Sequence, residues 1–234
     1  MKTEPNTSRM SLLALGETVL RPARIASAAV YEKHRSFYGM AITGIILVGL
    51  SVAFVDRPAS TWSHAVRHGH SVFPVPAVLL DPMLPLATVG LVAIGVITAV
   101  SHHLRPWKKT LIACCLATVV ALVLKDQLKY VFGRTFPESG ETGSPSWIGT
   151  GAYGFHPFHG GAAWASFPSG HTAAVTAAAG VLWQRVRALR WVWGSAVVLV
   201  ALALFGTDYH FVGDIVAGAY LGVGCAATVL TLLT

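Results

Sequence analysis

Two histidines in this 234-residue chain stand beside residues suited to phosphate chemistry. The first, His210, precedes Asp214 by four residues, at the start of an apolar stretch. On a helix, this spacing lets the carboxylate accept one imidazole N–H, which fixes the tautomer and leaves the other ring nitrogen free to attack. A purely structural hydrogen bond at a helix start is the alternative interpretation.

The second histidine, His171, ends the run Phe-Pro-Ser-Gly-His at 167–171, directly before the small-residue stretch 172–180. A helix that begins there presents backbone N–H groups, the Ser169 hydroxyl and a positive dipole end, which together favour an anion near Gly170. An ordinary helix cap would use the same residues.

Three cations precede these motifs. Lys125 and Lys129 are four residues apart and would share a helix face, and a turn at Gly133 would bring Arg134 alongside them. Such a group suits phosphate, although cations at a helix end also serve as interface anchors. The combination of cations, an anion site and a His/Asp pair is what indicates a phosphate-handling site.

The composition indicates a membrane protein, since 12% of residues are charged, 54% are hydrophobic and the mean hydropathy is +0.61. Uncharged stretches that approach or reach spanning length occur at 37–55, 82–100, 110–124, 191–207 and 215–234. A sixth stretch, 172–184, is short, so it either extends upstream or is recessed among the other helices. The predicted fold is an all-α, polytopic bundle of six transmembrane helices over 37–234. It follows a tail, 1–36, that has no cleavable signal and is either a disordered tail or an interfacial helix over 11–30.

Lysines and arginines predict the orientation. With six spans, twelve of the 17 fall on the side of the N-terminal tail and five on the other side. The positive-inside rule then places both termini in the cytoplasm and the long third loop outside, in the periplasm of a Gram-negative bacterium. We therefore expect a multi-pass protein of the bacterial inner (plasma) membrane.

Other classes of function are disfavoured. The three cysteines lie in apolar stretches and form no disulfide or metal pattern, and the basic residues form no nucleic-acid recognition motif. Histidines 64, 68 and 70 have metal-compatible spacing, but no cysteine or carboxylate cluster lies nearby in the sequence. We expect no metal and no cofactor. His156 and His159, in the aromatic and glycine-rich stretch 153–164, form either a lid or head-group pocket or an interfacial loop.

These motifs resemble the type 2 phosphatidic acid phosphatase superfamily, also called lipid phosphate phosphatases, over about residues 82–230. Pro-Ser-Gly-His at 168–171 matches the middle motif of that family, and His210 with Asp214 matches the end of its last motif. The chain departs from the family at two places. Phe136 stands before Pro137 where the first motif has arginine, and Ala203–Leu204 replace the Ser-Arg that opens the last motif.

The resemblance implies a membrane lipid phosphate as substrate and a catalytic core at about 110–225. It implies a metal-independent reaction in which His210 is the nucleophile, Asp214 orients it and His171 protonates the leaving alkoxide. The residues expected to bind the substrate phosphate are Lys129, Arg134, Ser169, Gly170 and Lys125, with Arg134 compensating in part for the missing arginines. A lipid phosphotransferase and a non-catalytic protein with a degenerate site remain the alternatives.

Overall fold

The structure is a computed structural model that describes residues 35, 37–67, 85–87, 89–90, 93–94, 96–97, 105–138 and 144–233. Helices account for the regular structure of these residues, and extended pairing is limited to isolated bridges. In chain order the elements are η1 (Ser51–Val55), α2 (Asp56–Arg67), α5 (Pro106–Phe132), α6 (Trp147–Thr150), η2 (Ala162–Trp164), α7 (Gly170–Arg185), η3 (Arg187–Leu189), α8 (Arg190–Gly206) and α9 (Val212–Leu232).

The chain divides into two compact units, Met1–Thr43 and Gly44–Thr234. The described residues of the first unit, 35 and 37–43, are helical. The second unit contains every element named above. The predicted interfacial helix at 11–30, most of the predicted span at 82–100, and histidines 68 and 70 lie outside the described residues.

Four helices in the described part of the chain are long and apolar enough to cross a membrane: Phe37–Val66, Pro106–Phe132, Arg187–Gly206 and Val212–Leu232. They coincide with four of the stretches predicted from the sequence. The helix α7 has 16 residues and rises about 24 Å, which is less than the roughly 30 Å of a hydrocarbon core. It starts at Gly170 and is buried along much of its length, so it is recessed among its neighbours and does not extend upstream. Six spans therefore remain a prediction.

Small residues bring α7 against α9 and α5. The shared core consists largely of alanines and cysteines from these three helices, among them Ala117, Ala177 and Ala226. On α9, Gly218 and Gly222 are one turn apart and face the α7 backbone, because a Cβ added to Gly222 would lie 2.6 Å from the carbonyl oxygen of Ala173. Helices in lipid gain stability from such close backbone approach, since no hydrophobic force draws them together.

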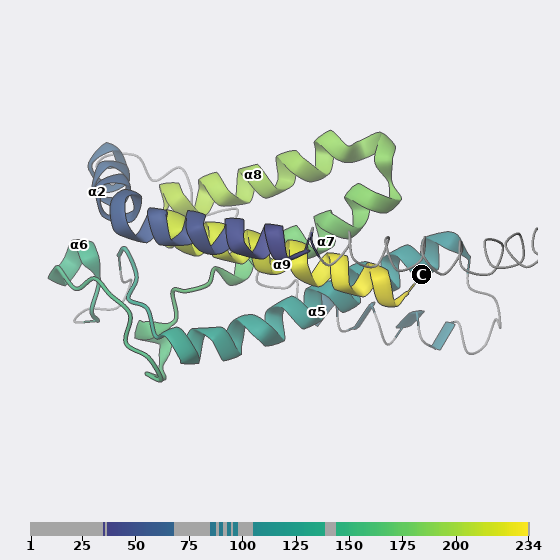
Figure 1. The fold of residues 1–234 in the computed structure, drawn as a ribbon, viewed down its shortest axis with the longest axis horizontal. Helices are drawn as coiled ribbons and strands as arrows, with labels where there is room; N and C mark the ends of the chain where they lie inside the picture. The colour runs from purple at the N-terminus through teal and green to yellow at the C-terminus, as the bar shows by residue number, and fades with distance from the viewer. Residues whose placement is uncertain are drawn as a thin grey trace, which may run out of the picture. The chain divides into compact units, whose positions relative to one another are not determined.

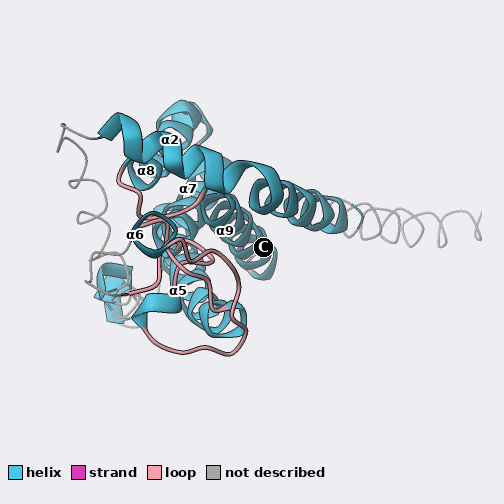
Figure 2. Cartoon of the chain, turned by 90° about the vertical axis from the view of Figure 1, so that its left-hand side faces the viewer, coloured by secondary structure: helices cyan, strands magenta, loops and turns pink. Residues whose placement is uncertain are grey.

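The bundle gathers its connecting loops at one end. The segment after α5, the N-termini of α7 and α9 and the C-terminus of α8 lie together there, beside α2 and α6 (Figure 1). Figure 2 looks onto this end and shows the loops in front of the helices. The sequence motifs for phosphate chemistry all fall at this end.

The α7–α9 contact can be tested with two alanine substitutions in the same helix. Gly222→Ala should lower the free energy of unfolding by about 1–3 kcal/mol, because the new methyl group overlaps the backbone of Ala173 and Ala177. Gly224→Ala is the control, because nothing lies within 4 Å of its added Cβ and alanine favours the helix. Thermal unfolding in detergent would measure both variants. Equal melting temperatures would show that the contact is not needed.

Candidate functional site

His210 lies in the loop between α8 and α9 and is almost fully buried, with 2% of its surface exposed. Its Nδ1 atom faces Asp214 Oδ2 at 3.5 Å and Ser166 Oγ at 3.4 Å. These partners favour the tautomer with the proton on Nδ1, which leaves the Nε2 lone pair on the opposite side of the ring. The structure thus brings the predicted pair together in the orientation that a nucleophilic imidazole requires.

Asp214 lies in the first turn of α9 and is fully buried. Its Oδ1 accepts a hydrogen bond from Arg134 Nη1 at 2.5 Å. Its Oδ2 accepts from Ser166 Oγ at 2.6 Å and from the Phe211 backbone N–H at 3.0 Å. A buried carboxylate with this many donors stays ionised and fixed, so it provides a rigid partner for His210.

Arg134, predicted as a phosphate ligand, has a fully buried side chain. Its Nη2 donates to Asp56 Oδ2 at 2.5 Å and to Tyr153 Oη at 3.0 Å, while Nη1 is bonded to Asp214. Burial alone would lower the pKa of Arg134, but the charges of Asp214 and Asp56 outweigh it and raise the pKa above its ordinary value. The guanidinium therefore joins two carboxylates and does not face an open anion site.

The Arg134 network reaches the first long helix. Asp56 accepts the Gly213 backbone N–H at 2.8 Å through its Oδ1, and Tyr153 donates its hydroxyl proton to the Val52 carbonyl at 2.6 Å. Burial raises the pKa of Tyr153, which keeps this hydroxyl protonated. The network thus joins residues of the first helix, the segment after α5 and the start of α9.

His171 is the second residue of α7 and is half-buried. The ring of Tyr209 lies beside both histidines, with centroid separations of 5.9 Å to His171 and 5.0 Å to His210. Ser169 is the N-cap of α7, and its Oγ accepts from the Thr172 N–H at 3.4 Å and from the Thr172 hydroxyl at 3.0 Å. Ser169 therefore caps α7, and its expected contact with a substrate phosphate stays a prediction.

The two lysines approach the same place from α5. A Cβ added to Gly170 would lie 3.2 Å from Cδ and Cε of Lys125, so this side chain covers the first turn of α7. The Nζ atom of Lys125 also forms an ion pair with Asp126 at 2.6 Å. Lys129 lies near enough to His210 for its charge to oppose protonation of the imidazole. Lys125 thus lies at the start of α7, and Lys129 lies near His210.

Burial lowers the pKa of His210 to about 4, from an ordinary value of 6.5. The bond and charge of Asp214 act in the opposite direction, whereas the charges of Lys129 and His171 lower the pKa further. The imidazole is consequently neutral at physiological pH, which is the protonation state of a nucleophile.

Sequence reasoning missed Asp56, Ser166 and Tyr153. The uncharged stretch ends at Val55, so the first span was expected to end there, but the helix continues to Val66 and buries Asp56. A carboxylate at membrane depth is costly unless it is paired, and that cost was the available signal. Ser166 and Tyr153 carried no comparable signal, because their partners are distant in the chain.

Two further histidines, in the segment between α6 and η2, pack on an aromatic ring. His156 and His159 lie 4.2 and 4.9 Å from the centroid of Trp164, and both are exposed. Neither contacts His210 or Asp214 among the interactions of the described residues. Their expected role as a lid or head-group pocket remains a prediction.

The fold and this arrangement define an all-α protein with several membrane-spanning helices and a His/Asp pair at one end of the bundle. The sequence model of the PAP2 superfamily matches residues 110–234, more than half of the chain, and the chain belongs to this superfamily.

A search of curated proteins gave no match. Among solved structures, the chain is similar to a transmembrane PAP2-type phosphatidylglycerolphosphate phosphatase from Bacillus subtilis. The TM-score is 0.52 at 18% sequence identity, and the alignment covers 84% of this chain and 94% of that one. At this identity the likeness concerns the fold, and it supports a multi-pass membrane protein.

The lowered pKa of His210 predicts a pH dependence of stability. Between pH 6.5 and about 4 the unfolded histidine binds a proton that the folded one does not, so stability should fall as pH falls through this range. The loss should reach about 3 kcal/mol at the lower limit. Melting temperatures of wild type, His210→Gln and the exposed-site control His159→Gln would be compared from pH 8 to 4. The control should parallel wild type and His210→Gln should show a shallower slope, whereas three parallel curves would contradict the prediction.

Proposed function

We propose that this protein is a metal-independent phosphatase that hydrolyses a lipid phosphate monoester or pyrophosphate through a phosphohistidine intermediate. The observation that carries the proposal is the buried His210, whose Nδ1 faces Asp214 and Ser166 while Nε2 points away from them. Membership of the PAP2 superfamily and the fold shared with a phosphatidylglycerolphosphate phosphatase support hydrolysis of a lipid phosphate.

In the proposed reaction, Nε2 of His210 attacks phosphorus in line, and the bond from phosphorus to the lipid oxygen breaks. His171 donates a proton to the departing alkoxide and later accepts one from the water that hydrolyses the phosphohistidine. Lys125, Lys129 and the Gly170 N–H stabilise charge on the phosphoryl oxygens, which is the main contribution that phosphoryl transfer requires from a protein. Ser169 fixes the start of α7 as its cap and presents this N–H to the phosphate.

Arg134 takes a different part in this proposal from the one expected from the sequence. Because its terminal nitrogens are bonded to Asp56, Asp214 and Tyr153, we assign it as a positioning residue that holds Asp214 against His210. Asp56 supports the same arrangement from the first helix. The phosphate then depends on the two lysines and the α7 N-terminus.

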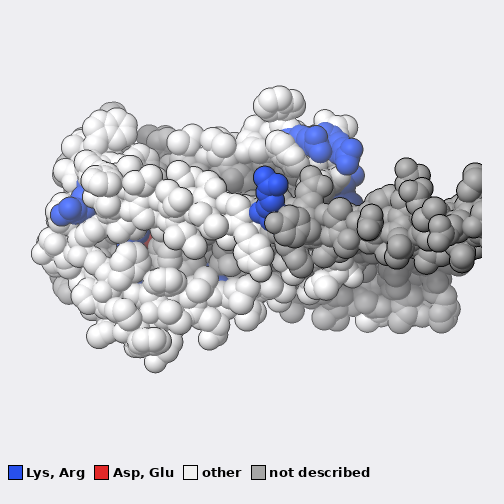
Figure 3. Space-filling model, viewed as in Figure 1, with Lys and Arg blue, Asp and Glu red and all other residues white. Residues whose placement is uncertain are grey.

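The proposed placement is the bacterial inner membrane, with six spans, both termini in the cytoplasm and the site facing the periplasm or exterior. Support comes from Arg185, Arg187 and Arg190, which lie where α7 ends and α8 begins, at the opposite end of these helices from the site. Figure 3 shows that the largest visible group of Lys and Arg covers this connection, while most of the remaining described surface on that face is uncharged. Arginines of a short connection favour the cytoplasmic side.

Two alternatives use the same fold. In a lipid phosphotransferase, a second lipid or sugar hydroxyl would accept phosphate from His210 in place of water. In a non-catalytic protein, the site would be a remnant. The complete set of donors around Asp214 favours a working site, because a remnant would be expected to lose buried charges that are costly in a membrane.

The first test is phosphate release by purified protein in detergent with excess chelator. The substrates would be phosphatidate, phosphatidylglycerol phosphate, a polyprenyl pyrophosphate and the phosphates of lipid A. Wild type and the control Gly224→Ala, whose added methyl group meets nothing within 4 Å, should release phosphate from at least one of them. His210→Ala should lose nearly all activity, since it lacks the nucleophile. Release that persists in His210→Ala would reject the histidine mechanism, and transfer to an added alcohol without release would favour the phosphotransferase.

A second test distinguishes whether Arg134 positions Asp214 or binds the substrate phosphate. If Arg134 positions Asp214, then Arg134→Lys should reduce kcat on the order of 100-fold with little change in KM, because a single ammonium cannot join two carboxylates. Asp56→Asn should also reduce kcat, by a smaller factor, although Asp56 is not assigned a contact with the substrate. Rates would be normalised to the folded, monodisperse fraction. A raised KM with kcat retained in Arg134→Lys would instead identify Arg134 as a phosphate ligand.

A further inference from the structure

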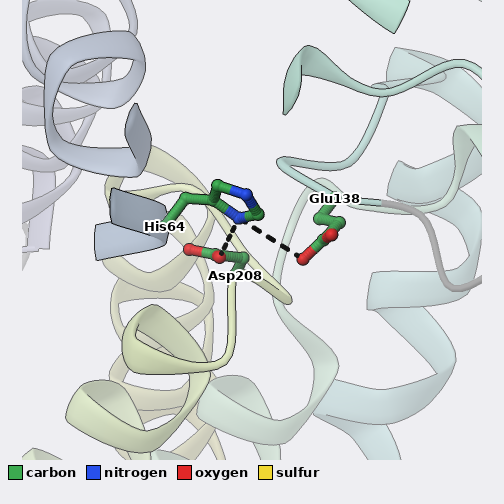
Figure 4. A group of neighbouring side chains, drawn as sticks. All are labelled: His64, Glu138 and Asp208. Carbon is green, nitrogen blue, oxygen red and sulfur yellow. Dashed lines mark hydrogen bonds and ion pairs between the residues drawn. The ribbon is translucent and has the colours of Figure 1, made fainter. Parts of the chain in front are cut away.

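A second cluster of polar side chains lies close to His210 but has no part in the proposed reaction. His64 of α2, Glu138 of the segment after α5 and Asp208 of the α8–α9 loop point toward one another (Figure 4). The Nδ1 atom of His64 lies 3.0 Å from Asp208 Oδ2 and 3.7 Å from Glu138 Oε2. One potential ligand atom from each residue lies within 4.8 Å of the other two.

The spacing of these atoms matches a small divalent cation. Ligand atoms in a tetrahedral zinc site, with bonds of about 2.1 Å, are roughly 3.4 Å apart, and the two distances from His64 lie on either side of this value. Zinc takes both imidazole nitrogen and carboxylate oxygen as ligands, and a site with three protein ligands leaves its fourth position to water.

Contacts other than those of the three side chains already hold the segments together. The Glu138 backbone N–H donates to the Asp208 carbonyl at 3.2 Å, which joins the two loops. Ser63 Oγ donates to the Phe205 carbonyl at 3.0 Å, and the rings of Trp62 and Phe205 stack at 6.4 Å, which joins α2 to the end of α8. A site built on such a scaffold requires little rearrangement on binding.

The cluster is also open to water on one side. The side chain of Asp208 is buried, whereas those of His64 and Glu138 are 23% and 33% exposed. An ion could therefore enter from solvent and complete its coordination with water.

We propose that His64, Glu138 and Asp208 form a binding site for a divalent transition metal of the zinc class, separate from the phosphatase chemistry. Binding uses the Nδ1 lone pair of His64, so the proton of the imidazole resides on Nε2, and the metal replaces the hydrogen bond from Nδ1 to Asp208. Because Asp208 is two residues from His210, the metal ties the loop that carries His210 to α2 and to Glu138. Its role is structural, and no step of phosphate release passes through it.

The test uses full-length protein in detergent, with any affinity tag removed and metals stripped by a chelator that is then removed. Zn²⁺ is added, free ion is separated by gel filtration, and bound zinc is measured by elemental analysis, with affinity taken from competition against a chromophoric chelator. Wild type should bind one equivalent. His64→Gln and Glu138→Gln should bind at least about 100-fold more weakly. His159→Gln, which removes an exposed histidine outside the cluster, should bind as wild type does.

Thermal unfolding gives a second measurement that does not depend on activity. Zn²⁺ should raise the melting temperature of wild type and His159→Gln, because it binds the folded state, and should leave that of Glu138→Gln unchanged. Zinc that remains bound with wild-type affinity in both cluster variants, or no bound zinc in wild type, would overturn the proposal. Either result would leave the histidine mechanism untouched, because chelated protein is used to test it.

Discussion

A carboxylate buried inside a protein must be compensated by nearby donors, and the arrangement of this protein follows from how Asp214 meets that requirement. One oxygen is bonded to Arg134, and the other accepts from Ser166 and from the start of its own helix while facing His210. Arg134 extends this network to the first helix, because its second terminal nitrogen donates to Asp56. The carboxylate of Asp214, which orients His210 in the proposed reaction, thus also helps to join three distant segments of the chain through Arg134. Loss of Arg134 would leave the buried carboxylates of Asp56 and Asp214 without their cation, so geometry at His210 and stability of this end of the bundle are coupled.

Packing of α9 against α7 brings the start of α7, with Gly170 and His171, close to His210. Gly218 lies against the carbonyl of Ser169, and the Ser169 N–H donates to the Asp214 carbonyl at 3.1 Å. This contact sets the start of α7 beside the start of α9, so that Gly170 and His171 lie near His210. A side chain larger than hydrogen at position 218 would separate the two helix starts. The small residues of α9 therefore position the residues of the candidate site as well as stabilise the bundle.

The sequence was sufficient for the parts of this arrangement that are local. Uncharged stretches predicted four helices that the structure contains, and Pro-Ser-Gly-His with the His210/Asp214 pair indicated the superfamily. Periodicity could not reveal the bond between Arg134 and Asp56, which are 78 residues apart, or the one between His64 and Asp208, which are 144 apart. Arg134 was grouped with Lys125 and Lys129 because charge and spacing do not show which cation meets a carboxylate. Spacing likewise groups His64 with its neighbouring histidines, because a sequence pattern does not show that Glu138 and Asp208 lie close to it in the fold.

The two positions at which the resemblance predicts a departure from the family motifs both lie beside His210 in the structure. Phe136, at the place of the first missing arginine, lies 6.0 Å from His210 and 5.8 Å from Tyr209 between ring centroids. Leu204, at the place of the second, is fully buried, and its carbonyl accepts the N–H groups of Tyr209 and His210. Ring contacts of Phe136 and backbone hydrogen bonds to Leu204 therefore help to hold the loop of His210. In the proposed reaction, phosphate is then held by two ammonium groups and a helix N-terminus. Ammonium groups act as point charges and impose less geometry than a bidentate guanidinium, so discrimination among lipid phosphates must come from contacts with the rest of the lipid.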